Sequence, residues 1–121
     1  MLERRENQRV QTSLFVRFDG ADDQNRALQH GSFTQDVSLG GMRLLSPVPL
    51  KANVPIFLNI DIPNDPEMAQ VEAQVRWAET NARTDENGNQ VFPAGVEFAF
   101  IERQDAACLR DFLNYEMRER L

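Results

Sequence analysis

The segment VPIFLNIDI, residues 54–62, carries the clearest structural pattern in the chain. Every second position is apolar, and these residues are Val54, Ile56, Leu58, Ile60 and Ile62. Because successive side chains of a strand point to opposite faces of a sheet, the alternation predicts a strand with one buried face. The turn-rich stretches SPVPLKAN and PNDPE flank this segment, as is typical of a strand in an antiparallel sheet.

The same alternation on both sides of this segment predicts further strands. It recurs in SLFVRF (13–18), SFTQDVS (32–38), VEAQVRW (71–77) and AGVEFAF (94–100). Strict alternation places Trp77 on the core face with Val75. The Asn87–Gly88 pair lies in an acidic run that lacks the spacing of a calcium loop, and it predicts a hairpin turn. Short strands at this spacing predict a mainly β domain, either a small barrel or a sandwich.

The C-terminal segment changes from the period of a strand to that of a helix. Leu109, Phe112, Leu113 and Met117 recur at helical spacing after Asp105, which is a plausible N-cap. We therefore expect a basic N-terminal arm over residues 1–12 and a β domain over residues 13–121. An amphipathic helix should begin at about residue 105.

Composition narrows the class of protein. The 121 residues suit one domain, and a net charge of −6 argues against binding to nucleic acid polymers or anionic membranes. No apolar run is long enough for membrane insertion, and the N-terminus lacks the apolar region of a signal peptide. The single cysteine and single histidine cannot build a disulfide or a zinc site. We expect a cytoplasmic protein without a metal or cofactor.

An enzyme is not expected. Ser38 and Cys108 are possible nucleophiles, but the only histidine, His30, lies in a polar stretch. Nucleophilic catalysis needs a base within reach and a group that orients it, and the sequence supplies no such set.

Two short polar motifs remain. Arg5 and Arg9 form an R-x-x-x-R pair, and residues 36–41 read DVSLGG. If Val37 faces the core, Asp36 and Ser38 should project outward from the end of a strand. Taken alone, the first motif fits a solvated chain start and the second fits a turn that closes a hairpin.

In this order, on a six-strand pattern with a trailing helix, the two motifs resemble those of the PilZ domain family. GGMRLLS, VEAQVRW and AGVEF are similar to strands of that family. The resemblance implies a six-stranded antiparallel β-barrel with a C-terminal α-helix that binds cyclic di-GMP, a bacterial second messenger. The implied ligand-binding residues are Arg4, Arg5, Arg9, Asp36, Ser38 and Gly41, with Trp77 as a possible stacking partner that competes with its place in the core.

The resemblance also bears on stoichiometry and output. In the family, an arginine directly before the R-x-x-x-R pair, here Arg4, accompanies two stacked ligand molecules per chain. The implied function is a receptor whose surface changes on binding, so that an unidentified downstream protein can respond. The alternative is a PilZ-like interaction module, for example in pilus or motility assemblies, that binds no nucleotide.

Overall fold

The computed structural model describes residues 8–119. The strands are β1 (Val10–Gln11), β2 (Phe15–Ala21), β3 (Ala27–Val37), β4 (Gly41–Ser46), β5 (Pro55–Ile60), β6 (Ala69–Ala78), β7 (Arg83–Thr84) and β8 (Gln90–Ile101). One helix, α2 (Arg103–Glu119), follows them.

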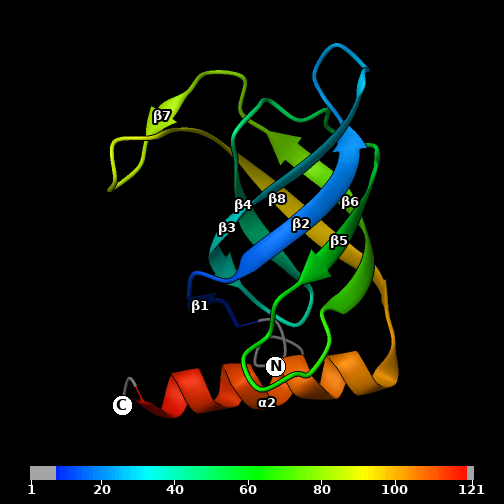
Figure 1. The fold of residues 1–121 in the computed structure, drawn as a ribbon, viewed down its shortest axis with the longest axis vertical. Coiled ribbons are helices and arrows are strands. Elements are labelled where there is room, and N and C mark those ends of the chain that lie inside the picture. Colours follow the sequence, from blue (N-terminus) through cyan, green and yellow to red (C-terminus); the bar gives the residue numbers. More distant parts are fainter. Residues whose placement is uncertain (1–7, 120–121) are drawn as a thin grey trace.

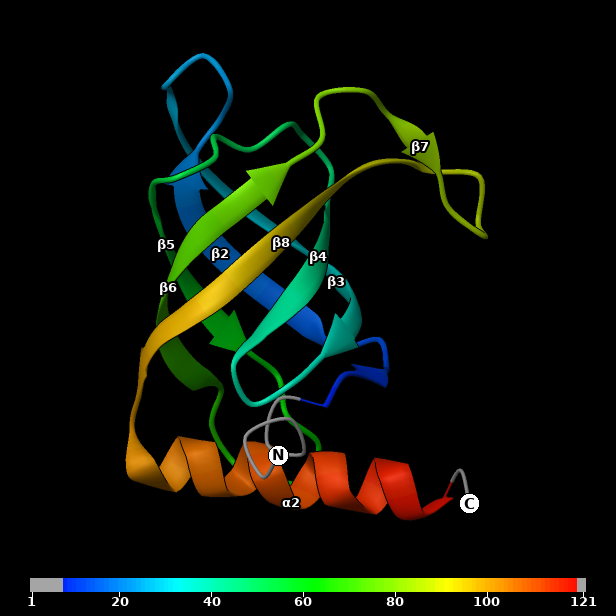
Figure 2. The ribbon, with the colours of Figure 1, turned by 180° about the vertical axis from the view of Figure 1, so that it is seen from behind.

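The six longer strands form a closed antiparallel barrel. Their order is β3-β2-β5-β6-β8-β4, and β4 pairs back with β3 to complete the ring. Every pairing in the ring is antiparallel. Figures 1 and 2 show the barrel from opposite sides, with β1 at one margin of β3. The prediction of a six-stranded antiparallel barrel with a C-terminal helix is confirmed.

The barrel interior is filled by the alternating apolar residues. Ile56, Leu58 and Ile60 of β5 are each at most 1% exposed, as the pattern in residues 54–62 predicts. Val16 and Phe18 of β2 join them in one continuous core. Burying an aliphatic or aromatic side chain of this size contributes about 1.5–3 kcal/mol, so this interior is the main source of stability.

Helix α2 lies across one end of the barrel (Figures 1 and 2). It buries Leu109 and Leu113 against the core, as its apolar stripe predicts. The helix begins at Arg103, so the prediction of Asp105 as the N-cap is wrong. Asp105 lies in the first turn, and its carboxylate accepts a hydrogen bond from the Gln70 backbone N–H at 3.4 Å. Among residues 8–119, no helix has the length and apolar character needed to cross a membrane.

A hairpin made by β7 and the start of β8 projects from the opposite end of the barrel (Figures 1 and 2). Its turn contains the Asn87–Gly88 pair, and Gly88 has a φ of 83°, which glycine adopts without strain. The Asp85 carboxylate accepts hydrogen bonds from the backbone N–H groups of Asn87 and Asn89. The acidic run is therefore a hairpin turn, as predicted.

Candidate functional site

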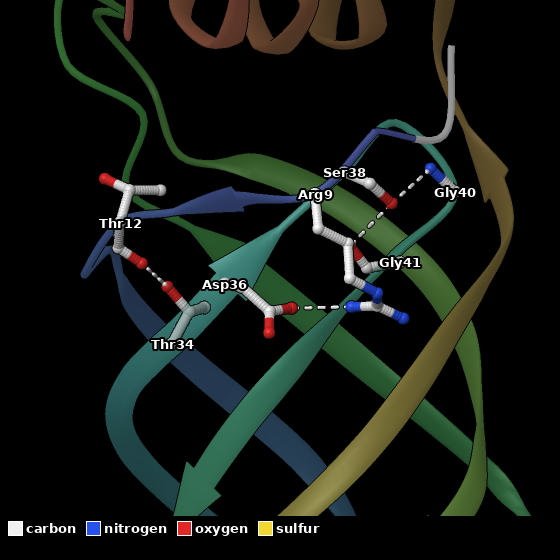
Figure 3. A network of polar contacts seen from close by, with 7 residues as sticks. All are labelled: Arg9, Thr12, Thr34, Asp36, Ser38, Gly40 and Gly41. Carbon is white, nitrogen blue, oxygen red and sulfur yellow. Dashed lines mark hydrogen bonds and ion pairs between the residues drawn. The ribbon is translucent and has the colours of Figure 1, made fainter. Parts of the chain in front are cut away.

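Strand β1 brings the two sequence motifs together. Val10 and Gln11 pair with Val37 and Asp36 of β3, so Arg9 lies beside the start of the DVSLGG segment. The Arg9 guanidinium donates to the Asp36 carboxylate, with Nη1 and Oδ1 2.5 Å apart (Figure 3). The Arg9 side chain is 55% exposed and that of Asp36 18%, so this pair is accessible to a ligand from solution.

Ser38 lies inside the turn that joins β3 to β4. Its backbone N–H donates to the Gly41 carbonyl at 2.8 Å, and its hydroxyl donates to the same oxygen at 3.3 Å. The same hydroxyl accepts a bond from the Gly40 N–H (Figure 3). Val37 is buried as expected, but Ser38 is only 4% exposed, so the expectation that it projects outward is wrong. These hydrogen bonds hold the turn.

Gly41 is held close to a neighbouring strand. A Cβ added there would lie 2.2 Å from the carbonyl oxygen of Val96 and 3.3 Å from the Cα of Glu97, both in β8. Contacts this short are incompatible with any side chain, so β4 and β8 can pair here only because residue 41 is glycine. The structure thus gives Gly41 a packing role in the barrel.

Arg43 belongs to the same face, although it lies outside both sequence motifs. It is the β4 partner of Asp36, and its side chain is 30% exposed. The guanidinium lies over the Trp77 ring, 5.4 Å from the ring centre, and Nη2 is 3.9 Å from a carboxylate oxygen of Glu79. Its Nε is buried and makes no hydrogen bond to the described residues. The part of the Arg43 guanidinium that a ligand can reach is therefore its exposed end and not the buried Nε.

Trp77 lies on the outer face of the barrel, so of the two placements left open, in the core or facing a ligand, the core placement is wrong. The pairing of β6 with β8 shifts register between Val75 and Trp77, and this bulge turns the indole outward, where it is 42% exposed. The ring covers Gly95, at which an added Cβ would lie 2.1 Å from the indole nitrogen. The indole therefore lies between Gly95 and the Arg43 guanidinium and is partly exposed to solvent.

These residues form a row across four strands. Asp36 pairs with Arg43, Arg43 pairs with Gly95, and Gly95 pairs with Trp77. With strands about 4.8 Å apart, the row spans about 14 Å, and Arg9 adds a guanidinium at its Asp36 end. We call Arg9, Asp36, Arg43 and Trp77 the strand-row site.

The structure brings Arg9, Asp36 and Trp77 of the expected residues onto this one surface, with Ser38 and Gly41 in the turn beside it. Arg4 and Arg5 lie outside the described residues. Chemically, the site offers two guanidinium forks, one carboxylate acceptor and one aromatic face. This set suits a planar ligand that carries anionic groups.

Solved structures with a similar fold include three proteins of low sequence identity. The PilZ domain of YcgR from Escherichia coli, solved with c-di-GMP, is 17% identical with a TM-score of 0.60, and the match covers 97% of this chain and 95% of that chain. MotI/DgrA, an inhibitor of motility from Bacillus subtilis, is 17% identical with a TM-score of 0.60 and 93% of this chain covered. MrkH from K. pneumonia in its apo state is 16% identical with a TM-score of 0.62 and 93% of this chain covered.

The chain spans about half the length of two of these proteins, 49% of MotI/DgrA and 50% of MrkH. None of the curated proteins compared with the sequence matches it. The PilZ domain family model, in contrast, matches residues 3–115, which is nearly the whole chain. The chain therefore belongs to the PilZ domain family.

Proposed function

We propose that this protein is a receptor for cyclic di-GMP that binds it through Arg5-x-x-x-Arg9 and Asp36-x-Ser38-x-x-Gly41. The observation that carries the proposal is the Arg9–Asp36 contact, which joins motifs 27 positions apart on one accessible surface. Membership of the PilZ family and the c-di-GMP bound to the YcgR domain support it.

The chemistry of the ligand matches these side chains. Cyclic di-GMP carries two phosphodiester anions and two guanines, and each guanine presents its O6 and N7 acceptors on one edge. A guanidinium fork can grip either a phosphate or this edge with two parallel hydrogen bonds. The opposite edge of guanine carries N–H groups, and the Asp36 carboxylate can accept hydrogen bonds from them. Arginine thus binds anion and guanine, while Asp36 distinguishes guanine from adenine.

Binding requires the ion pair between Arg9 and Asp36 to open. In the structure each of these groups is the hydrogen-bond partner of the other. A guanine that bridges them replaces one charge-assisted contact with two, because its acceptors meet the guanidinium and its donors meet the carboxylate. An exposed ion pair contributes at most about 1 kcal/mol, so opening it costs little compared with the hydrogen bonds that the guanine forms.

We further propose two ligand molecules per chain. Two stacked molecules bring four negative charges, which Arg5 and Arg9 alone would not balance, and Arg4 is the adjacent donor. Arg43 and Trp77 favour the same arrangement, since they extend the site with a cation and a stacking face beyond Asp36.

The output is proposed to travel through β1. The Thr12 hydroxyl donates to the Glu116 carboxylate of α2 at 3.2 Å, and the Thr12 carbonyl accepts a bond from Thr34 of β3 at 2.7 Å (the latter is drawn in Figure 3). A ligand held between Arg9 and Asp36 would change how β1 lies on β3, and with it the contact between Thr12 and Glu116. This changed surface is what a downstream partner protein would recognise. Amide exchange over residues 3–12 should slow on ligand addition, and equal protection in both states would contradict this route.

Calorimetric titration with cyclic di-GMP, and with cyclic di-AMP as the matched competitor, tests the receptor function. We expect micromolar or tighter binding of cyclic di-GMP and much weaker binding of cyclic di-AMP, with Asp36→Ala losing both affinity and this preference. Equal binding of the two dinucleotides by the parent would remove the role given to Asp36. If the folded parent bound neither, an interaction module without nucleotide binding would be the better description.

A further inference from the structure

A second surface lies on the outer face of β5, β6 and β8, where these strands approach the start of α2. It is a groove of about 710 Å³. Phe57, Glu72 and Phe100 stand side by side across it, because Phe57 pairs with Glu72 and Glu72 pairs with Phe100. Phe57 is 51% exposed and Phe100 is 55% exposed. Two large aromatic side chains are therefore left in water on adjacent parts of one face.

The groove is strongly acidic. Its carboxylates are those of Asp65, Glu67, Glu72, Glu102 and Asp105. None of the described residues that line it is a lysine or an arginine. The pKa of the nearby Cys108 thiol is raised, first by burial and then by the negative charges of Asp65, Asp105 and Asp111. Like charges that line one groove repel one another, and a cationic occupant would relieve the repulsion.

Several kinds of occupant do not fit this surface. Among residues 8–119 no group of histidine, cysteine or carboxylate side chains is arranged to hold a metal ion. A nucleotide or phosphate would be repelled by the carboxylates. Strand addition is excluded because β5, β6 and β8 are each paired on both sides within the ring. Two copies meeting through this face would place acidic groups against acidic groups.

We propose that this face, the Phe57–Phe100 groove, is a docking site for a basic amphipathic helix of a partner protein. Phe57 and Phe100 are two strand spacings apart, about 9.6 Å. Residues i and i+7 of a helix are about 10.5 Å apart on one face, so two apolar side chains of one helix can meet both phenylalanines. Lysine or arginine residues beside that apolar stripe would meet the carboxylates.

The groove is separate from the proposed cyclic di-GMP site. No residue that lines the groove belongs to the strand-row site. A failure to bind cyclic di-GMP would therefore leave the docking proposal untouched, and a failure to bind a basic helix would leave the receptor proposal untouched.

The test uses an 18-residue amphipathic Leu/Lys peptide as the probe and a Leu/Glu peptide as its charge control. We expect the Leu/Lys peptide to shift the amide resonances of Phe57, Glu72 and Phe100 in a saturable manner, with an affinity that falls as salt is raised. The Leu/Glu peptide should cause no shift. Loss of all shifts at these positions with the Leu/Lys peptide would overturn the proposal.

Matched variants locate the contact. Phe57→Ser combined with Phe100→Ser, and separately Glu67→Lys combined with Glu102→Lys, should each weaken peptide binding at least tenfold while circular dichroism stays unchanged.

The controls are Phe33→Ser, whose side chain is also 51% exposed, and Asp23→Lys in the exposed β2–β3 turn. Both should bind the peptide like the parent, and an equal loss of binding in them would refute the site. A dimer seen by sedimentation and abolished by the Phe57 and Phe100 changes would also overturn the proposal, because the occupant would then be a second copy.

Discussion

The substitution Gly41→Ala should destabilise the barrel severely, although it adds a single methyl group. The new carbon would lie 2.2 Å from the Val96 carbonyl oxygen, where an ordinary contact between carbon and oxygen is about 3.3 Å. Its nearest neighbours are backbone atoms of β8, which cannot rotate away as the end of a side chain can. Strands β4 and β8 must therefore separate by about 1 Å at the pair formed by Gly41 and Glu97.

The magnitude follows from what this separation breaks. Overpacking of this kind costs about 1–3 kcal/mol. Loss of the bond from the Phe98 N–H to the Gly40 carbonyl, now 2.8 Å, and of one ladder bond would add about 1 kcal/mol each. Replacing glycine by alanine returns about 0.4–1 kcal/mol through the unfolded chain. The net loss is about 2–4.6 kcal/mol, a large share of the roughly 5–15 kcal/mol of a typical domain.

Urea denaturation followed by far-ultraviolet circular dichroism measures this loss. With a slope of about 1.5 kcal/mol per molar urea, the midpoint should fall by about 1.3–3.1 M. Gly20→Ala is the matched control, because its nearest neighbour is the Ile56 side chain at 3.3 Å, which can shift by a few tenths of an ångström. Its midpoint should stay close to that of the parent. A Gly41→Ala midpoint equal to the parent's would refute the reasoning.

Three further outcomes are expected. Arg9→Ala should weaken cyclic di-GMP binding about 5- to 70-fold. A hydrogen bond to a charged group contributes about 1.5–3 kcal/mol, from which the small free energy of the exposed ion pair with Asp36 is subtracted. Unchanged affinity in titration would contradict the role of Arg9. Arg4→Leu should shift the stoichiometry from two ligands toward one, and a parent stoichiometry of one would remove that assignment. The hydrogen bond from the Arg26 backbone N–H lowers the pKa of Asp22 below its ordinary 3.8. The Asp22 carboxylate therefore stabilises the turn fully above pH 3.8, and this stabilisation is lost as the pH falls through the lower pKa of the folded protein. The thermal midpoints of Asp22→Ala and parent should therefore differ at pH 7 and converge in strong acid, and a difference that persists in acid would argue against this linkage.

Alternation along single strands predicted most of the barrel, because each strand buries one face only. It failed at Trp77 for a reason that lies in the neighbouring strand. Gly95 of β8 has no side chain, and the indole occupies the space above it where β6 bulges after Val75. A bulge depends on the register between two strands, which the pattern along one strand does not contain.

The sequence predicted which residue types belong to the candidate site, but it predicted only part of their arrangement in space. The R-x-x-x-R and D-x-S-x-x-G spacings made Arg9 and Asp36 candidates, yet their contact depends on a two-residue strand, β1, too short to show a pattern. Ser38 was placed outward because the turn that captures its hydroxyl interrupts the alternation. Arg43 could have been found, since a tight turn that pairs Val37 with Met42 also sets Asp36 opposite Arg43.

The closed ring has a consequence for how the chain reaches its native state. The β3–β4 and β5–β6 seams join neighbouring strands, but the β4–β8 seam joins Gly41 to Glu97 and the β2–β5 seam joins Val16 to Ile60. Such distant pairings place all-β domains among the slow folders, on the scale of milliseconds to seconds. Until the β4–β8 seam closes, both strands present unpaired backbone edges to other chains. Refolding yield should therefore fall with protein concentration, and the glycine that allows this seam to close also shortens the interval in which chains can associate wrongly.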